Sequence, residues 1–308
     1  MNDRPRFGLI GTGVWPRLVQ APAAAQSDAV SFTSVFGRNA LKAEALAAPF
    51  RVRAYSDLGA FLDSVDIVGI TLPPAVQPHF ALAAARAGKA AILEKPLALD
   101  PLEADAIARE FETRELPALV FFTHLLIPRT QAWLNDVATA GGWIAARVDS
   151  YSRLLHDEAN PFFGTVAAWR GAAGALWDSG PHSVAMLLTT LGDIVQVSAI
   201  RGTGDLKLLT LTHVGGAVSS IALTMDAPTS LPGETALFGA AGKTTLPQSP
   251  DWFADSTVAY AGALRLVAGA LAEKKVDIAP GVRLGAKVTK VLAAAEQSIA
   301  TGRRIDLP

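Results

Sequence analysis

The first part of the chain alternates short apolar segments with helical segments, and this alternation constrains the fold more than any other feature. Continuous apolar runs of this length are typical of strands that are buried on both faces. Strands that alternate with helices over short connections favour a parallel sheet with crossover helices. The runs that we predict to be strands are residues 7–10, 30–36, 52–54, 66–72, 90–95 and 118–122.

Residues at the ends of the intervening helices support this interpretation. Asn39 and Ser56 can cap the helices that follow them, and Asp100 before Pro101 is a strong helix start. Gly88 is suited to end the helix over residues 75–87. Pro22 should kink or end the first helix, because proline removes a backbone donor.

The pattern changes after residue 123. Short links such as 202–205 and 215–216 indicate hairpins between neighbouring strands. We therefore predict an α/β protein with two domains, a nucleotide-binding domain over residues 1–123 and an α+β domain over 124–308 that carries a large open, mostly antiparallel sheet. The second domain should contain strands at 143–152, 195–201, 206–213, 218–225 and 235–246, a helical stretch at 175–191 and a closing helix at about 283–300.

Composition excludes several classes of protein. The net charge of the 308 residues is −1 and the basic residues are scattered, so we expect neither nucleic-acid nor membrane binding. The absence of cysteine rules out disulfides and thiolate metal sites, and no two histidines have metal-ligand spacing with an acid, so we predict no metal. The high apolar content of 50% favours a buried subunit interface. The N-terminus lacks a secretory apolar core, so we expect a cytoplasmic protein.

A glycine-rich turn follows the first predicted strand. Gly11 permits a tight turn, and Gly13 lets the backbone approach a pyrophosphate at the N-terminus of the next helix. Pro16 replaces the third glycine of the usual fingerprint, which a first helical turn tolerates. The position of this turn in a βαβ unit predicts a Rossmann dinucleotide site, and a glycine turn without a ligand is the alternative.

The end of the second strand bears on the choice of coenzyme. It reads Gly37-Arg38-Asn39 and contains no acid that could bond the ribose 2′-hydroxyl of NAD. Arg38 offers a permanent charge for the 2′-phosphate of NADP. We predict NADP(H) as the preferred coenzyme. The alternatives are an exposed Arg38 with use of NAD(H) as well, or an S-adenosylmethionine site, although methyltransferases usually keep an acid here.

Two polar segments supply candidate chemistry. Glu94 and Lys95 end a buried strand at the edge where open α/β sheets bind ligands, although a salt-bridged strand end before a turn proline is the alternative. Asp178 and His182 lie four positions apart on one helix face, so the histidine can exchange a proton with an alcohol or carbonyl while Asp178 orients the ring or bonds the same hydroxyl. A helix-surface contact is the alternative for this pair. His124 could face the same cleft.

In order and spacing, these segments resemble the Gfo/Idh/MocA oxidoreductases, a family named for glucose–fructose oxidoreductase, inositol 2-dehydrogenase and a rhizopine-catabolism enzyme. The resemblance covers nearly the whole chain. The segments that carry it are Gly11-Thr12-Gly13, Thr71-Leu72-Pro73-Pro74, Ala87-Gly88-Lys89, Glu94-Lys95-Pro96, Trp169-Arg170, the stretch 174–182 and the closing 301–304.

The resemblance implies hydride transfer between a nicotinamide ring and a sugar, polyol or similar small molecule. It implies that Lys95 contacts the nicotinamide ribose and the substrate, that Asp178 contacts the substrate hydroxyl, and that His182 is the acid/base. It also implies a cis bond before Pro96, and a homodimer or homotetramer assembled through the second sheet. Further residues implied at the coenzyme are Thr12, Val14, Trp15, Leu72, Pro73, Gln77 and Glu94, and those implied at the substrate are His124, Trp169 and Arg170.

Three departures from the family pattern leave other functions open. Ala185 stands where an acid often follows the histidine, Gln77 replaces a histidine, and Thr123-His124-Leu125 replaces a polar Asn-Arg-Arg stretch. The pocket wall is therefore less polar than in typical sugar dehydrogenases. One alternative is a reductase of an apolar ketone or dihydrodiol, and the other is a non-catalytic nucleotide-binding sensor on the same scaffold.

Overall fold

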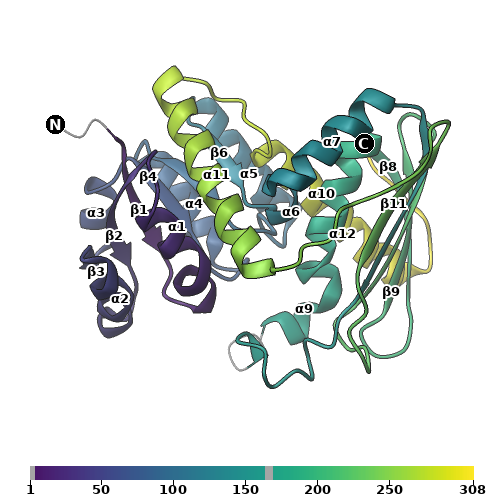
Figure 1. Ribbon diagram of the computed structural model, residues 1–308, viewed down its shortest axis with the longest axis horizontal. Coiled ribbons are helices and arrows are strands. Elements are labelled where there is room, and N and C mark those ends of the chain that lie inside the picture. The colour runs from purple at the N-terminus through teal and green to yellow at the C-terminus, as the bar shows by residue number, and fades with distance from the viewer. Residues whose placement is uncertain (1–3, 164–168) are drawn as a thin grey trace. The chain divides into compact units, whose positions relative to one another are not determined.

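The computed structural model describes residues 4–163 and 169–308, and the side chains of these residues except 169–173. The chain forms two compact units (Figure 1). The first unit contains Met1–Ile127 and Asp251–Ala286, and the second contains Pro128–Pro250 and Lys287–Pro308. The first boundary lies close to the predicted one, but the segment 251–286 packs with the first unit rather than with the second.

A six-stranded parallel sheet forms the centre of the first unit, as the alternating pattern predicts. Its strands lie in the order β3-β2-β1-β4-β5-β6. Strands β2 and β3 therefore lie on one side of β1, and strands β4 to β6 lie on its other side. The strands are β1 (Arg6–Ile10), β2 (Ser31–Phe36), β3 (Arg53–Tyr55), β4 (Ile67–Ile70), β5 (Ala90–Leu93) and β6 (Ala118–Val120). This order is that of a Rossmann sheet, in which ligands bind where the strand order reverses.

Short helices connect these strands. They are η1 (Pro16–Gln20), α1 (Ala21–Ala25), α2 (Ala40–Ala47), η2 (Ala48–Phe50), α3 (Leu58–Asp63), α4 (Gln77–Arg86), α5 (Pro101–Thr113) and α6 (Thr123–Leu126). Asn39 and Asp100 cap α2 and α5 as predicted. Ser56 was the wrong cap for α3, because the carboxylate of Asp57, one residue closer, accepts the N–H of Ala60 at 2.7 Å.

The first helix continues through Pro22, so this proline does not end it. The turn before Pro22 is π-helical rather than α-helical. Residues Pro16–Gln20 form a π-helical turn, and α1 follows without a break to Ala25. Pro22 stands in the first turn of α1 and directly follows the wider turn. The missing donor therefore falls where the hydrogen-bond register of the helix changes, which is where a helix tolerates it.

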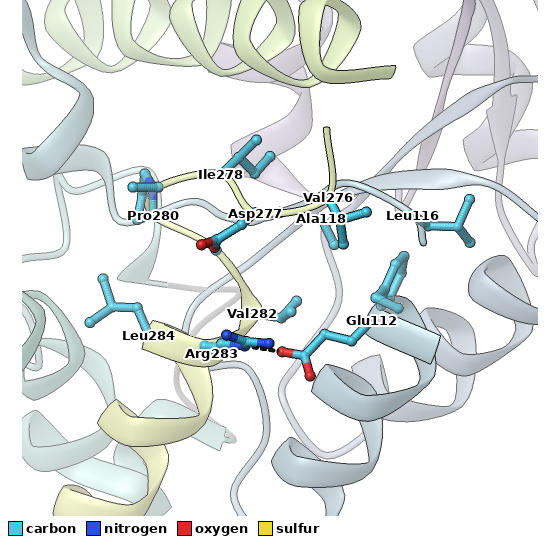
Figure 2. A pocket seen from close by; sticks show the side chains of 13 residues that line it. Glu112, Leu116, Ala118, Val276, Asp277, Ile278, Pro280, Val282, Arg283 and Leu284 are labelled. Atoms are coloured by element: carbon cyan, nitrogen blue, oxygen red, sulfur yellow. Dashed lines mark hydrogen bonds and ion pairs between the residues drawn. The ribbon is translucent and has the colours of Figure 1, made fainter. Parts of the chain in front are cut away.

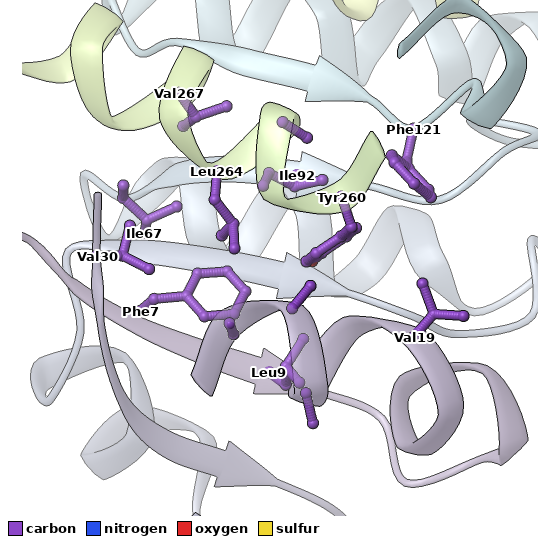
Figure 3. Close-up of a cluster of buried hydrophobic side chains, with 14 of the residues drawn as sticks. Phe7, Leu9, Val19, Val30, Ile67, Ile92, Phe121, Tyr260, Leu264 and Val267 are labelled. Carbon is purple, nitrogen blue, oxygen red and sulfur yellow. The ribbon is translucent and has the colours of Figure 1, made fainter. Parts of the chain in front are cut away.

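A long helix that was not predicted, α11 (Trp252–Glu273), belongs to the first unit. Its inner face presents Tyr260, Leu264 and Val267 to the sheet, where they pack with Phe7 and Ile92 (Figure 3). Burying such side chains stabilises the unit by about 1.5–3 kcal/mol for each large residue. The segment therefore completes the core of the first unit although it lies far away in the sequence.

The second unit contains a seven-stranded sheet in the order β12-β11-β7-β10-β9-β8-β13. Neighbouring strands are antiparallel except for β7 and β10, so the predicted mostly antiparallel sheet is confirmed. The strands are β7 (Trp143–Tyr151), β8 (Ile194–Arg201), β9 (Lys207–His213), β10 (Val218–Thr224), β11 (Glu234–Gly239), β12 (Gly242–Thr245) and β13 (Ile305–Asp306).

Helices cover one face of this sheet. They are α7 (Pro128–Ala140), α9 (Trp169–Asp178), α10 (Gly180–Leu191) and α12 (Val282–Thr301), the last of which begins in the first unit. Leu209, Leu211 and Ile221 on the covered face are buried, whereas Ile200 and Leu208 on the opposite face are exposed. The alternation along the strands thus leaves one open face with exposed apolar side chains.

Candidate active site

The glycine-rich turn lies at the carboxyl edge of the parallel sheet. Gly11 has a φ of +123°, and its N–H donates to the carbonyl of Phe36 at 3.1 Å. A Cβ at Gly11 would lie 2.3 Å from the carbonyl oxygen of Thr71, so only glycine fits here. A Cβ at Gly13 would meet nothing within 4 Å, and Gly13 is exposed. The turn therefore leaves open space next to a helix start, which fits the pyrophosphate of a dinucleotide.

The end of β2 lies next to this turn. A Cβ at Gly37 would lie 2.7 Å from Cγ2 of Thr12, so the two turns pack closely. Arg38 is exposed, while Asn39 uses its side-chain oxygen to cap α2. Arg38 is consequently the residue of this turn that offers a charged donor to a ribose substituent.

A hydrogen-bonded network joins Glu94 to the first helix. The Oε1 atom of Glu94 accepts from Nε1 of Trp15 at 2.9 Å and from Nε2 of Gln20 at 2.7 Å. The Oε1 atom of Gln20 accepts in turn from the hydroxyl of Thr71. Charged groups with several hydrogen bonds tolerate partial burial, so the network explains how a carboxylate persists at this strand end. Gln20 is not among the predicted site residues, because its only signal in the sequence is a polar residue on the inner face of a helix.

Gln77 supports the backbone on both sides of Lys95. Its side chain is fully buried, and Nε2 donates to the carbonyls of Glu94, Pro96 and Leu97 at 2.7, 3.1 and 3.1 Å. Its Oε1 accepts from the N–H of Glu94 at 2.9 Å. The Lys95–Pro96 bond is cis, as expected. The observed role of Gln77 is to hold this turn, and its predicted contact with the coenzyme stays a prediction.

His124 lies near Lys95 in the first unit. Its ring contacts that of Trp252, with centroids 4.8 Å apart. Burial, together with the nearby positive charge of Lys95, lowers the pKa of His124 from 6.5 to about 4. The imidazole of His124 is therefore neutral at neutral pH, and can accept or donate a hydrogen bond without carrying charge.

Asp178 and His182 lie in the second unit on either side of a helix break. Asp178 ends α9 and is 8% exposed, whereas His182 is half-buried in the first turn of α10. Ser179, between the two helices, keeps right-handed helical angles with φ of −88° and ψ of −35°. The side chains of Trp169 and Arg170 lie outside the described residues. Lys95 belongs to the first unit, so the convergence of these groups on one coenzyme is part of the function proposed below.

Two of the remaining histidines lie on other elements of the fold. His79 is exposed on α4. His213 is buried, with its two ring nitrogens 2.8 Å from the carbonyl of Gly192 and 2.9 Å from the hydroxyl of Ser219, as expected of a structural residue. Among the described residues, no three His, Cys, Asp or Glu side chains gather as ligands for a metal ion.

A separate cavity of about 220 Å³ lies in the first unit (Figure 2). The end of α5, the start of β6 and the segment 276–284 line it, and an ion pair between Glu112 and Arg283 lies in its wall. Parallel strands begin at this edge of the sheet, so the cavity is at the edge opposite the glycine turn. It therefore contributes nothing to the coenzyme site.

Residues 5–122 match the model of the family described as "Oxidoreductase family, NAD-binding Rossmann fold". This segment is similar to the NAD-binding domain of the Gfo/Idh/MocA oxidoreductases. The match agrees with the glycine turn, the Glu94-Lys95-Pro96 turn and the strand order of the first unit.

Similar proteins include several named dehydrogenases. The UDP-N-acetylglucosamine 3-dehydrogenase of Acidithiobacillus ferrooxidans is 39% identical over 113 residues, which cover 36% of this chain and 34% of that protein. The curated relatives are matched over 34% to 57% of their own length. Among solved structures, myo-inositol 2-dehydrogenase from Lactobacillus plantarum has a TM-score of 0.87 at 17% identity, covering 99% of this chain and 100% of that one.

A second solved structure, levoglucosan dehydrogenase in complex with NADH and levoglucosan, has a TM-score of 0.85 at 19% identity and covers 99% of this chain and 100% of that chain. At these identities the structural matches establish the fold of the chain. Among the described residues, no helix has the length and apolar character needed to cross a membrane.

Proposed function

We propose that the protein is an NADP(H)-dependent oxidoreductase that transfers hydride between a nicotinamide ring and a carbonyl or secondary alcohol of a sugar, polyol or related small molecule. The observation that carries this proposal is the open space above Gly13 at the same sheet edge as Lys95. A dinucleotide bound at that edge would extend to Lys95, whose ammonium is the cation that the chain supplies there.

The coenzyme site that we propose is built by the turns at the carboxyl edge of the parallel sheet. Backbone N–H groups at the start of the first helix would bind the pyrophosphate, although Pro16 contributes none. Arg38 would bind the 2′-phosphate of NADP(H). The other residues of the proposed site are Gly11, Thr12, Gly13, Val14, Trp15, Gly37, Asn39, Leu72, Pro73, Gln77, Glu94 and Lys95.

The proposed chemistry uses three side chains. The bound coenzyme supplies the acceptor or donor of hydride. His182 takes the proton of the substrate hydroxyl during oxidation and returns it to the carbonyl oxygen during reduction, while Asp178 bonds the same hydroxyl or orients the ring. The ammonium of Lys95 stabilises negative charge that develops on the substrate oxygen. His124, Trp169 and Arg170 are proposed to line the substrate pocket.

Turnover by variants tests this assignment. A panel of sugars, inositols and apolar ketones is followed at the NADPH absorbance, and the best substrate is then used with His182→Ala. General acid–base help is typically worth about 10²–10⁴-fold, so turnover should fall by that factor while NADPH affinity is unchanged. Unchanged turnover would remove His182 from its role. His79→Ala, on an exposed helix position of the first unit, is the matched control.

The coenzyme preference is tested by titrating NADPH and NADH against the purified protein. NADPH should bind more tightly, because Arg38 is exposed beside the glycine turn and no acid ends β2. Equal affinities would contradict this part of the proposal and leave the dehydrogenase assignment standing. Two of the similar solved structures are named with NAD or NADH, so NAD(H) is the competing candidate.

Two other functions are separated by the same panel. The alternative of an apolar ketone or dihydrodiol is supported by Leu125 and Leu126, which are buried next to His124. A non-catalytic nucleotide sensor would bind NADPH and turn over none of the compounds.

We further propose that the open face of the second sheet joins subunits into a homodimer or homotetramer. A cytoplasmic location stays a prediction of the sequence.

A further inference from the structure

The segment that carries Asp178 and His182 is held by a carboxylate from a different element. Asp205, in the hairpin between β8 and β9, accepts the N–H of Ala175 on Oδ2 at 2.9 Å and the N–H of Met225 on the same atom at 3.2 Å. Its Oδ1 accepts from Nζ of Lys207 at 3.0 Å. The side chains of Asp205 and Lys207 are only 12% and 11% exposed. Asp205 is therefore a nearly buried, fully engaged carboxylate.

Gly174 makes room for this carboxylate. Its φ of 68° and ψ of −173° break α9, and the chain resumes a helical course at Ala175. A Cβ at Gly174 would lie 2.4 Å from Oδ1 of Asp205. The glycine and the carboxylate are thus fitted to each other at the start of the helical stretch, where a negative charge complements the free N–H groups.

A chain of backbone hydrogen bonds leads from Ala175 to His182. The carbonyl of Ala175 accepts the N–H of Ser179 at 2.9 Å, and the carbonyl of Ser179 accepts the N–H of His182 at 3.2 Å. Asp178 precedes Ser179 in the same turn. The position of Ala175, which Asp205 fixes from outside, therefore sets the position of both side chains.

We infer that Asp205 is a positioning residue for Asp178 and His182, and that it acts through the N–H of Ala175. This inference rests on the proposed function for its effect on turnover, but not for its effect on the His182 ring. Burying a carboxylate and its ammonium partner is costly unless every hydrogen bond is made. A tightly held capping carboxylate is suited to fix a site that must keep its geometry within a fraction of an ångström.

Two Asp205 variants and a matched control test the inference. Asp205→Ala removes all the side-chain hydrogen bonds. Asp205→Asn keeps one oxygen acceptor but sets an amide donor against either Lys207 or the backbone N–H groups. Asp193→Asn is the control, because Asp193 forms an exposed ion pair with Lys287 at 2.6 and 2.8 Å just after the other end of α10.

The first measurement is a long-range proton–nitrogen correlation spectrum of the labelled full-length protein, which reports the ring nitrogens of its five histidines. The His182 signal is identified by its loss in His182→Gln. We expect Asp205→Ala to shift the His182 nitrogens, Asp205→Asn to shift them less, and Asp193→Asn to leave them unchanged. If Asp205→Ala does not fold by circular dichroism, Asp205→Asn carries the test. Unshifted His182 signals in every folded Asp205 variant would overturn the inference.

The second measurement is steady-state turnover with NADPH and the best substrate of the panel. A displacement of about 1 Å at a reacting group costs roughly 10²-fold, so kcat of Asp205→Ala should fall by about that factor with the KM for NADPH unchanged. A loss in His182→Ala with none in Asp205→Ala would refute the positioning role alone. Full turnover in His182→Ala would refute the proposed function, while the spectrum would still decide the role of Asp205.

Discussion

The indole N–H of Trp15 donates to Oε1 of Glu94 at 2.9 Å, which joins the start of the first helix to the end of β5. The same carboxylate oxygen accepts from Gln20 one helical turn further on. Glu94 thereby fixes the helix whose N-terminus faces the open space above Gly13. The residue that the sequence marks as a coenzyme contact also has a clear structural task.

Glu94→Ala should therefore reduce both stability and coenzyme binding. Hydrogen bonds to a charged group contribute about 1.5–3 kcal/mol, so we expect the free energy of unfolding to fall by roughly 2 kcal/mol. We also expect about 1.4 kcal/mol of the binding free energy of NADPH to be lost, which raises its dissociation constant about tenfold. Urea unfolding and fluorescence titration measure the two effects. Glu112→Gln is the control, because its partner Arg283 is 70% exposed and such an ion pair contributes at most about 1 kcal/mol.

The two glycines of the turn should respond in opposite ways to alanine. Gly11→Ala combines a positive φ with a Cβ 2.3 Å from the carbonyl oxygen of Thr71, so it should destabilise the first unit by several kcal/mol. Gly13→Ala places its Cβ in open space and should leave the melting temperature unchanged. It should nevertheless weaken NADPH binding, because the methyl group occupies the approach of the pyrophosphate. Unweakened binding by Gly13→Ala would contradict this placement of the phosphates.

Arg38→Ala should change coenzyme choice without changing stability. Arg38 is exposed, so the fold does not depend on its side chain. Losing a charged contact of about 1.5–3 kcal/mol should weaken NADPH binding about 10–100-fold and leave NADH binding unchanged. Lys42→Ala, on the exposed first turn of α2, is the control. An equal loss for both coenzymes would show that Arg38 does not recognise the 2′-phosphate.

His124 should make the stability of the protein depend on pH. Its pKa in the folded state is about 4, below the ordinary value of 6.5, so the unfolded chain binds the proton more tightly. The associated stabilisation is complete above about pH 6.5 and is lost as the pH falls towards about 4, by at most about 3 kcal/mol. His124→Gln should flatten this part of the pH profile of urea unfolding, whereas His79→Gln should not. An unchanged slope in His124→Gln would place the proton uptake elsewhere.

The sequence was sufficient to predict the strands of the first unit, because runs such as 67–70 and 90–93 are apolar on both faces. No helix was predicted at α11, because small residues such as Ala259 and Ala263 give a weaker helical periodicity of apolar side chains than large residues would. The sequence also failed to place this helix with the first unit, since that packing depends on contacts between distant parts of the chain.

The residues of the candidate site likewise divide into those that the sequence indicates and those that only the structure shows. Lys95 and His182 could be named as candidates because charge at a strand end and an Asp/His pair beside a proline are unusual. Gln20, Gln77 and Asp205 act through hydrogen bonds to other residues. Polar residues of this kind have no local pattern that separates them from exposed ones, so their supporting roles emerge only in the folded structure.

The open face of the second sheet provides a final prediction, on the proposed assembly. Ile200 and Leu208 are paired across β8 and β9 on this face and are 61% and 39% exposed. Leu208→Glu should bury an uncompensated charge if subunits pair through this face, and should therefore convert the oligomer to monomers in light scattering after gel filtration. Val214→Glu is the matched control, because Val214 is 69% exposed in the hairpin after β9 rather than on the face. An unchanged mass for Leu208→Glu would exclude this part of the sheet from the interface.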